Sequence, residues 1–174
     1  DNMLNKFEFG GAGKKGIYFD EENRRHLIRL RSLYGEAAGN MADIGKKEEA
    51  QKLIEKCEAG ISPENIPYGM VSRFNSHNQF SLVYLEGCYK AGKKDLAEKV
   101  RLAVRKDLED QQRYYNSLKE NYPDYYSGLE RPEVQINDRM LVVLAAIEQK
   151  YAPQTQATVP KEGPSTIINT INEA

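Results

Sequence analysis

The sequence predicts an all-α fold in which antiparallel helix hairpins stack as divergent tetratricopeptide-like repeats. Apolar residues recur at steps of three and four over most of the stretch 20–151, which is typical of amphipathic helices. Strict alternation of apolar and polar residues, the mark of a half-buried strand, is missing outside the first 20 positions. Glycine and proline interrupt the helical pattern at clear intervals. The chain therefore divides into an irregular aromatic, glycine-rich arm (1–19), a helical domain (20–151) and an extended tail rich in Pro, Thr and Gln (152–174).

The first two helices of the domain are expected to form a hairpin. Asp20 can cap the first helix, and acidic residues in its first turn suit the helix dipole. The apolar face of this helix runs from Leu27 to Ile44, and Gly45 ends it. The second helix follows at once with an apolar stripe over 50–61. It ends where two prolines follow, because proline cannot continue a helix interior.

Three further helices complete the predicted domain. Asp95 and Glu98 have the spacing of a capping box at the start of the fourth helix. The fifth helix is apolar over most of its surface between Met140 and Ile147, which indicates burial on more than one side. The tail can add one short amphipathic turn over 165–174. The third, fourth and fifth helices are expected over about 68–91, 95–121 and 133–151.

Two similar stretches indicate an internal repeat. Gly45-Lys-Lys-Glu-Glu-Ala50 and Gly92-Lys-Lys-Asp-Leu-Ala97 each lie between a longer helix and its partner. A glycine followed five positions later by an alanine resembles the turn of tetratricopeptide repeats. There the glycine permits a sharp reversal and the alanine allows close helix packing. The alternative is a pair of ordinary helix hairpins.

Composition limits the classes of protein to which this chain can belong. Its 174 residues suffice for one domain with a sizeable core, and its formal net charge is −1. A near-neutral net charge argues against a protein that binds nucleic acid through a strongly basic surface. The longest nearly apolar run, Met140 to Ile147, is far shorter than the roughly 20 residues that span a bilayer. We therefore expect the segment itself to be soluble and to bind no nucleic acid.

No residue pattern indicates catalysis, a cofactor or a metal ion. His26 and His77 are the only histidines, and neither belongs to a cluster with the spacing of metal ligands. Cys57 and Cys88 fall on the apolar stripes of neighbouring helices, so we expect them to lie close together. They are either two buried thiols that pack as small hydrophobic groups or, outside the cytoplasm, a disulfide. The segment is therefore predicted to be non-catalytic.

Tyrosines gather where the fourth expected helix ends. The chain has 11 tyrosines and no tryptophan. Such a cluster can form an aromatic groove for a peptide or a sugar chain, helped by neighbouring basic side chains. Otherwise it is a packed corner with hydroxyl groups at its rim. The candidate interaction surface consists of Tyr114, Tyr115, Tyr122, Tyr125 and Tyr126, together with Arg113 and Lys119.

A family resemblance rests on several stretches taken in order. They are DNMLNKFEFG (1–10), GIYFDEENR (16–24), GKKEEA (45–50), PENIPY (63–68) and YKAG (89–92). The chain resembles, over roughly residues 1–118, a bacterial family of large multi-pass membrane proteins. These proteins are of the GT-C glycosyltransferase type and are similar to protein O-mannosyltransferases. They have an N-terminal membrane region and a soluble C-terminal region with tetratricopeptide-like helices.

The resemblance implies that the chain is the soluble C-terminal region of such a glycosyltransferase. The catalytic residues would lie in the membrane region, so none is carried onto a position here. The whole protein would sit in the cytoplasmic membrane, with this domain on the periplasmic face positioning acceptor polypeptide or a partner protein. The aromatic arm would then lie on the membrane side through Phe7, Phe9, Tyr18 and Phe19. A free-standing scaffold protein with no attached enzyme is the alternative, and the sequence leaves the oligomeric state open.

Overall fold

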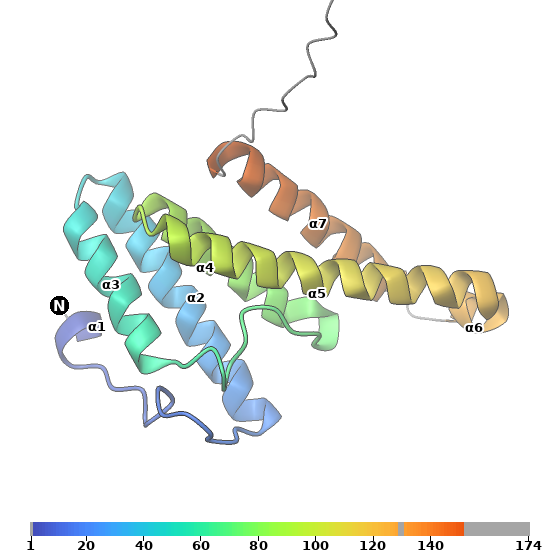
Figure 1. Ribbon diagram of the computed structural model, residues 1–174, viewed down its shortest axis with the longest axis horizontal. Coiled ribbons are helices and arrows are strands. Elements are labelled where there is room, and N and C mark those ends of the chain that lie inside the picture. The colour runs from blue at the N-terminus through green and yellow to red at the C-terminus, as the bar shows by residue number, and fades with distance from the viewer. Residues whose placement is uncertain (1, 129–130, 152–174) are drawn as a thin grey trace, which may run out of the picture.

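The computed structural model describes residues 2–128 and 131–151, and every regular element within these ranges is a helix (Figure 1). The all-α prediction is therefore confirmed. The predicted tail, with its short turn over 165–174, lies outside the described residues. The elements are α1 (Asn2–Asn5), α2 (Glu21–Asp43), α3 (Lys47–Gly60), the 3-10 turn η1 (Arg73–Asn75), α4 (Ser76–Lys90), α5 (Lys94–Asn121), α6 (Pro123–Gly128) and α7 (Arg131–Tyr151).

The first hairpin forms as its sequence predicts. The side chain of Asp20 caps α2 by accepting a hydrogen bond from the backbone N–H of Asn23 at 2.8 Å. Gly45 follows α2 with a left-handed backbone, φ 79°, which glycine adopts without steric cost. The chain then reverses into α3, whose buried residues include Leu53 and Ile54. Local capping and one glycine thus position the first two long helices.

The turn after α4 repeats the backbone of the turn after α2. Gly92 has a φ of 78°, against 79° for Gly45. In each turn the lysine after the glycine donates its backbone N–H, at 2.9 Å, to the carbonyl oxygen five residues before it. Ala50 and Ala97 are fully buried at the same place in the helix that follows. The helices themselves differ, since α3 has 14 residues and α5 has 28, so a repeat array stays a prediction.

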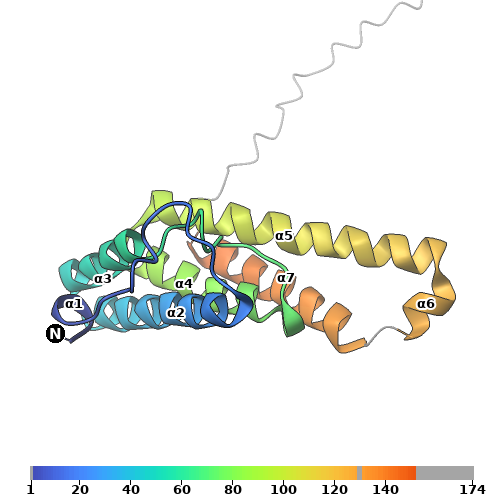
Figure 2. The same ribbon diagram turned by 90° about the horizontal axis from the view of Figure 1, so that it is seen from below.

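Helices α2 and α4 cross where neither has room for a side chain. A Cβ atom at Gly35 would lie 2.5 Å from Cα of Tyr84, and one at Gly87 would run into the backbone of Gly35. Tyr84 and Leu85, beside this crossing, are fully buried. Helices α2, α3 and α4 therefore group at one end of the molecule, and α5 extends from them to the other end, where α6 lies (Figures 1 and 2).

The third expected helix begins later than the sequence pattern indicates. The pattern predicts a start near residue 68, whereas α4 begins at Ser76. Ser72 is extended, and Phe74 and Asn75 have left-handed backbone angles, φ 51° and 53°. An α-helix cannot continue through such angles. The prediction of a continuous helix from residue 68 is therefore wrong, and the residues before α4 form a turn instead.

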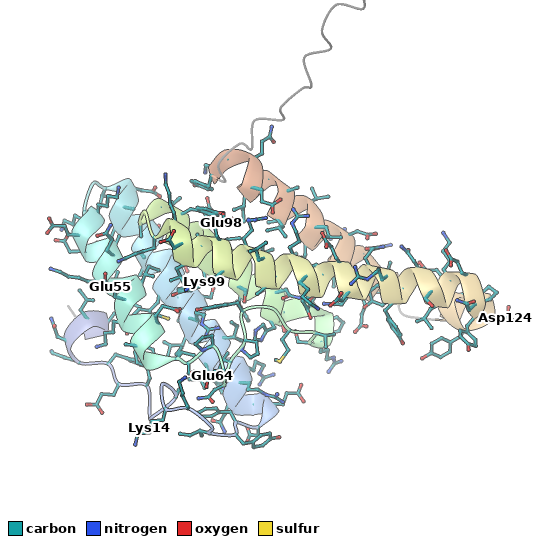
Figure 3. The ribbon with its side chains drawn as sticks, viewed as in Figure 1. Lys14, Glu55, Glu64, Glu98, Lys99 and Asp124 are labelled. Atoms are coloured by element: carbon teal, nitrogen blue, oxygen red, sulfur yellow. The ribbon has the colours of Figure 1, made fainter. Side chains whose placement is uncertain are left out.

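The capping box predicted at Asp95 and Glu98 is also wrong. The N-cap residue of α5 is Lys93, which makes no side-chain capping bond. The carboxylate of Glu98 instead accepts hydrogen bonds from the hydroxyl of Tyr89 and from the guanidinium of Arg101. Glu98, labelled in Figure 3, therefore links α4 to α5 rather than closing the first turn of α5.

Helix α7 packs back against α5 and α4 along one face. Leu144 is fully buried and Ile147 is nearly so, whereas Val142 is 70% exposed. The predicted burial of this helix on more than one side is therefore wrong. An apolar run indicates burial, but the direction of the neighbouring helices decides which of its residues are covered.

Polar and aromatic contacts fasten the end of α7. The carboxylate of Glu148 lies 2.8 Å from Nη1 of Arg101 and 3.0 Å from Nε of Arg105, both on α5. The ring of Tyr151 stacks on the ring of Tyr89 in α4, with centroids 5.4 Å apart. Charged groups and one aromatic pair therefore hold α7 against α5 and α4 in addition to its buried apolar residues.

The N-terminal arm packs onto the helical domain. The ring of Phe9 covers Gly60 and lies 5.3 Å from the ring of Tyr34, whose hydroxyl donates to the carbonyl oxygen of Met3 at 2.7 Å. Ala12 is fully buried. Figure 3 labels Lys14 of the arm and Glu64 of the connection after α3, which lie on the same side of the molecule. The sequence predicts no helix in this stretch, so α1 is a correction to that prediction.

Candidate binding groove

A groove lies between the first turns of α2 and the stretch that leads into α4. Its volume is about 980 Å³. One wall consists of residues between Glu21 and Arg29, and the other consists of residues between Met70 and Phe80. The two walls are far apart in the sequence, so the crossing of α2 and α4 is what brings them together.

Arginine side chains dominate the polar lining of this groove. Arg24, Arg25 and Arg29 come from α2, and Arg73 comes from η1. Arg25 pairs with Glu22 at 2.6 Å, whereas the residues that the structure describes offer no carboxylate partner to the other three. The Nε atom of Arg24 is buried and has no hydrogen-bond partner among them. Three of the four arginines in this groove therefore have no ion-pair partner among the described residues.

Apolar side chains line the groove beside the arginines. Met70 and Phe80 are half-buried, and Val71 and Phe74 are exposed. The guanidinium of Arg73 lies over the ring of Phe74, 4.9 Å from its centroid, in a cation–π contact. Cationic and apolar surfaces therefore lie side by side. A polypeptide segment with acidic and apolar side chains can match such a surface.

The backbone of one wall is held in an uncommon conformation. Within the described residues, positive φ angles outside glycine occur at Phe74 and Asn75. Positive φ is unfavourable for a bulky residue such as phenylalanine and persists where surrounding contacts enforce it. The bend places Phe74 in the lining of the groove and leaves Asn75 buried behind it.

A network of buried side-chain amides holds this bend. Asn75 accepts a hydrogen bond from Nδ2 of Asn78 at 2.7 Å and donates one to Oδ1 of Asn137 at 3.2 Å. Asn78 also donates to Asp107 at 2.6 Å and accepts from the backbone N–H of Met70 at 3.3 Å. The three asparagines are buried, and they come from η1, α4 and α7. Four elements, including α5 through Asp107, therefore fix the wall of the groove.

A neutral histidine lies at the inner side of the groove. Nε2 of His77 is 2.7 Å from the carbonyl oxygen of Pro67, so this nitrogen carries a hydrogen and donates it. Burial lowers the pKa of His77, and the guanidinium groups of Arg31 and Arg24 act in the same direction. The Pro67 carbonyl and the Asp107 carboxylate oppose this shift and raise the pKa. The net pKa is below the ordinary value, so the ring is uncharged at pH 7.

The predicted tyrosine surface lies on the end of α5 and on α6, at one tip of the molecule (Figure 1), and none of its residues lines the groove. Tyr115 is nearly buried, and its ring centroid lies 5.7 Å from that of Tyr114. Tyr126 is half-buried, and Asp124, labelled in Figure 3, marks the tip. The exposed members are Tyr114, Tyr122, Tyr125, Arg113 and Lys119. The set is thus divided between packed and exposed side chains, and its role in binding stays a prediction.

The aromatic residues of the arm are divided in the same way. Phe9 and Phe19 pack against the core, and the rings of Phe7 and Phe9 meet edge to face with centroids 5.3 Å apart. Tyr18 is 83% exposed. Phe9 and Phe19 are thus packed within the domain, whereas Phe7 and Tyr18 are exposed. A position on the membrane side stays a prediction.

The two cysteines are buried free thiols, the first of the two alternatives that the sequence left open. Cys57 lies on α3 and Cys88 on α4. Burial raises the pKa of Cys57 to about 12 and raises that of Cys88 well above its ordinary value. Since the thiolate is the reactive form, both side chains act as small apolar groups in the core.

Sequence reasoning did not find the groove. In the sequence, Arg25 and Arg29 lie on the polar face of an amphipathic helix, which is usually solvated, and the stretch 68–75 belongs to the third expected helix. One signal was present, because Pro67 followed by the polar run 72–78 breaks the helical period. That signal marks a turn, but it does not show that the turn faces α2.

None of the described helices combines the length and the apolar character that crossing a bilayer requires. Within the same residues, no group of three or more His, Cys, Asp or Glu side chains is arranged so that it could hold a metal ion. Comparisons of the chain with protein-family models, with curated proteins and with solved structures found no match. The groove is therefore the feature of the chain that points to a function.

Proposed function

We propose that this chain is a non-catalytic protein-interaction domain whose groove binds a polypeptide segment with acidic and apolar side chains. The observation that carries the proposal is the set Arg24, Arg29 and Arg73, which share the groove without carboxylate partners among the described residues. An acidic side chain would supply that partner, through hydrogen bonds about twice as strong as those between neutral groups. Phe74 and Phe80 would cover an apolar side chain next to it.

The groove is suited to binding because its wall is already fixed. The amide network around Asn75 and Asn137 supports the turn that carries Phe74 and Arg73. A preformed site avoids part of the conformational entropy that ordering a flexible surface costs on binding. This supports a recognition site rather than a surface loop that happens to carry arginines.

The family resemblance provides a setting for this activity. In a membrane-bound glycosyltransferase of the GT-C type, such a domain would hold acceptor polypeptide or a partner protein near the catalytic membrane region. It would lie on the periplasmic face and be attached through the N-terminal part of a longer protein. In a free-standing scaffold, the same groove would bind a partner without an attached enzyme. Membrane-spanning segments encoded upstream in the same reading frame would favour the first setting, and a frame without them the second.

A peptide-binding experiment tests the proposal. Short fluorescent peptides that alternate Glu with Phe or Leu are titrated with the purified 174-residue chain, and anisotropy reports binding. Control peptides replace Glu with Lys, or the apolar residues with Ser. Only the acidic, apolar peptides are expected to bind, and their affinity should fall as salt screens the charges.

Two paired variants locate the binding surface. Arg29→Gln/Arg73→Gln removes two unpaired arginines from the groove, whereas Lys99→Gln/Arg139→Gln removes the same charge from exposed positions elsewhere. The groove variant should bind about tenfold more weakly or worse, since two charge-assisted contacts are lost. The second variant should bind as the unmodified chain does. Equal loss in both variants, or equal binding of the Lys-containing peptide, would contradict the proposal.

A further inference from the structure

We infer that Arg24, Arg29 and Arg73 form a subsite for a phosphoryl group carried by a side chain of the bound polypeptide. The inference rests on the proposed function and adds the chemical class of the anion. It starts from the charge of the groove, where three guanidinium groups lack carboxylate partners in the described part of the chain. A ligand group with more than one negative charge can pair with more of these arginines than a single carboxylate can.

A phosphomonoester fits this requirement better than a carboxylate does. A carboxylate carries one charge and is satisfied by a single arginine through two parallel hydrogen bonds. A phosphorylated Ser, Thr or Tyr carries about −1.5 to −2 charges at pH 7 and presents three strong acceptor oxygens. Three arginines on two walls of one groove supply the positive charge that such a group requires. Clusters of arginine are a recurring means of recognising phosphorylated segments.

The position of Arg24 gives a second, independent observation. Its Nε atom is buried and has no hydrogen-bond partner among the described residues. Buried polar atoms in native proteins nearly always have a partner, so a buried donor without one marks a place where an acceptor is expected. Arg24 lines the groove, and a rotation of its side chain would bring this donor to an oxygen bound there.

Replacing Glu21 provides a test in which the phosphorylated peptide is expected to bind more tightly rather than more weakly. Its carboxylate lines the same groove and repels any anion bound there. Replacing Glu21 with Gln should therefore tighten the binding of a phosphorylated peptide, whereas replacing Arg29 and Arg73 should weaken it. Because the two changes act in opposite directions, general damage to the fold cannot imitate both results.

The shape of the site favours a polypeptide over a lipid surface. The arginines line a hollow of about 980 Å³ together with half-buried apolar side chains, Met70 and Phe80. A bound anion would therefore have an apolar neighbour inside the same hollow, as along a peptide. A flat bilayer surface would meet the rim of this hollow first. Lipid binding is one of the outcomes that the experiment distinguishes.

The experiment compares three peptides that differ at one position, which holds phosphoserine, Glu or Ser, by anisotropy at constant ionic strength. The phosphoserine peptide should bind about tenfold more tightly than the Glu peptide, and the Ser peptide should bind most weakly. Inorganic phosphate should compete for the site. Arg29→Gln/Arg73→Gln should abolish the preference for phosphoserine, Glu21→Gln should strengthen it, and Lys99→Gln/Arg139→Gln should leave it unchanged.

The outcomes separate this inference from the proposed function. Equal binding of phosphoserine and Glu peptides overturns the inference and leaves the proposed function standing. Binding of no peptide at all overturns both. Arginine-dependent binding to vesicles of phosphatidylcholine and phosphatidylserine, without a preference for phosphoserine, overturns the inference in favour of a lipid headgroup. A phosphoserine preference that both groove variants shift in the stated directions supports it.

Discussion

Asn75 donates a side-chain hydrogen bond to Oδ1 of Asn137 at 3.2 Å, across 62 positions of the sequence. Asn137 in turn donates to the carbonyl oxygen of Leu108 at 3.2 Å and to the side chain of Gln112 at 3.0 Å. Helix α7 thereby reaches the turn that forms one wall of the groove. The groove wall thus depends on the docking of a helix that does not line it.

The first prediction concerns this link. Asn137→Ala leaves the buried amide of Asn75 without its partner, and unpaired buried polar groups cost about 1–3 kcal/mol each. The free energy of unfolding in urea should fall by roughly that amount, and the acidic, apolar peptide should bind more weakly. Asn121→Ala, at an exposed position with local bonds to Ser117, is the control and should change stability by no more than about 0.5 kcal/mol. A stable Asn137→Ala variant with unchanged peptide affinity would refute the link.

The second prediction concerns the crossing of α2 and α4. Gly35→Ala would place a Cβ atom 2.5 Å from Cα of Tyr84, so one helix must move. The melting temperature should drop, with a loss of about 1–3 kcal/mol or more in the free energy of unfolding. Gly39→Ala is a matched control in the same helix, because its Cβ would meet Cδ of Lys90 at 3.4 Å and Cα of Gly87 at 3.9 Å, which is ordinary van der Waals contact. That variant should be neutral or more stable, since alanine favours helix over glycine by about 1 kcal/mol.

The third prediction is a dependence of stability on pH. Burial lowers the pKa of His77 in the folded chain, so the unfolded chain takes up this proton at higher pH. The contribution of His77 to the free energy of unfolding is complete above the pKa of histidine in the unfolded chain, about 6.5. It is lost as the pH falls from there toward the lower pKa in the folded chain, at up to about 1.4 kcal/mol per pH unit. Urea unfolding at several pH values should show this decline. His77→Gln, which keeps a donor for Pro67, should flatten it.

His26→Gln is the control for this experiment, because it removes an imidazole from an exposed position of the same groove lining. An equal flattening in both variants would mean that the burial of His77 is not the cause. An unchanged decline in His77→Gln would assign the pH dependence to other groups.

Sequence patterns predicted those parts of the fold that local chemistry decides. Gly45 and Gly92 adopt the left-handed turn that a glycine after an amphipathic helix indicates, and Asp20 caps α2 as its position predicts. Phe74 adopts the same region of backbone angles although its side chain disfavours it. Contacts with distant helices enforce that bend, as the bond from Asn75 to α7 shows. No local pattern contains this information.

The groove escaped prediction for the same reason. Arg29 and Arg73 become neighbours in one hollow only because α2 and α4 cross at their glycines and the turn before α4 bends back. The tyrosine cluster, by contrast, is close in sequence and was therefore visible. Because these tyrosines are close in sequence, they could be proposed as a site from the sequence alone. In the structure some of them are packed and others exposed, at one tip of the molecule, and none lines the groove.

The last prediction concerns how α7 is held. Glu148 pairs with Arg101 and Arg105 of α5, and the side chain of Glu148 is only 17% exposed. Glu148→Gln removes the charge while keeping the shape, so both arginines lose an ionic partner in a partly shielded place. The expected loss is about 1–3 kcal/mol, below the cost of breaking a fully buried pair because solvent screens part of the interaction. Amide hydrogen exchange should show the loss mainly in α7.

Glu109→Gln is the matched control, since Glu109 pairs with the same Arg105 from a position that is 46% exposed. Its effect should stay within about 0.5 kcal/mol, as for most exposed pairs within a helix. If Glu148→Gln leaves the exchange protection of α7 unchanged, the buried apolar residues, the stack of Tyr151 on Tyr89 and the bonds of Asn137 hold this helix without the charged contact. If protection falls, the charged contact and the bond between Asn75 and Asn137 act together, and the peptide affinity of the groove should fall with it.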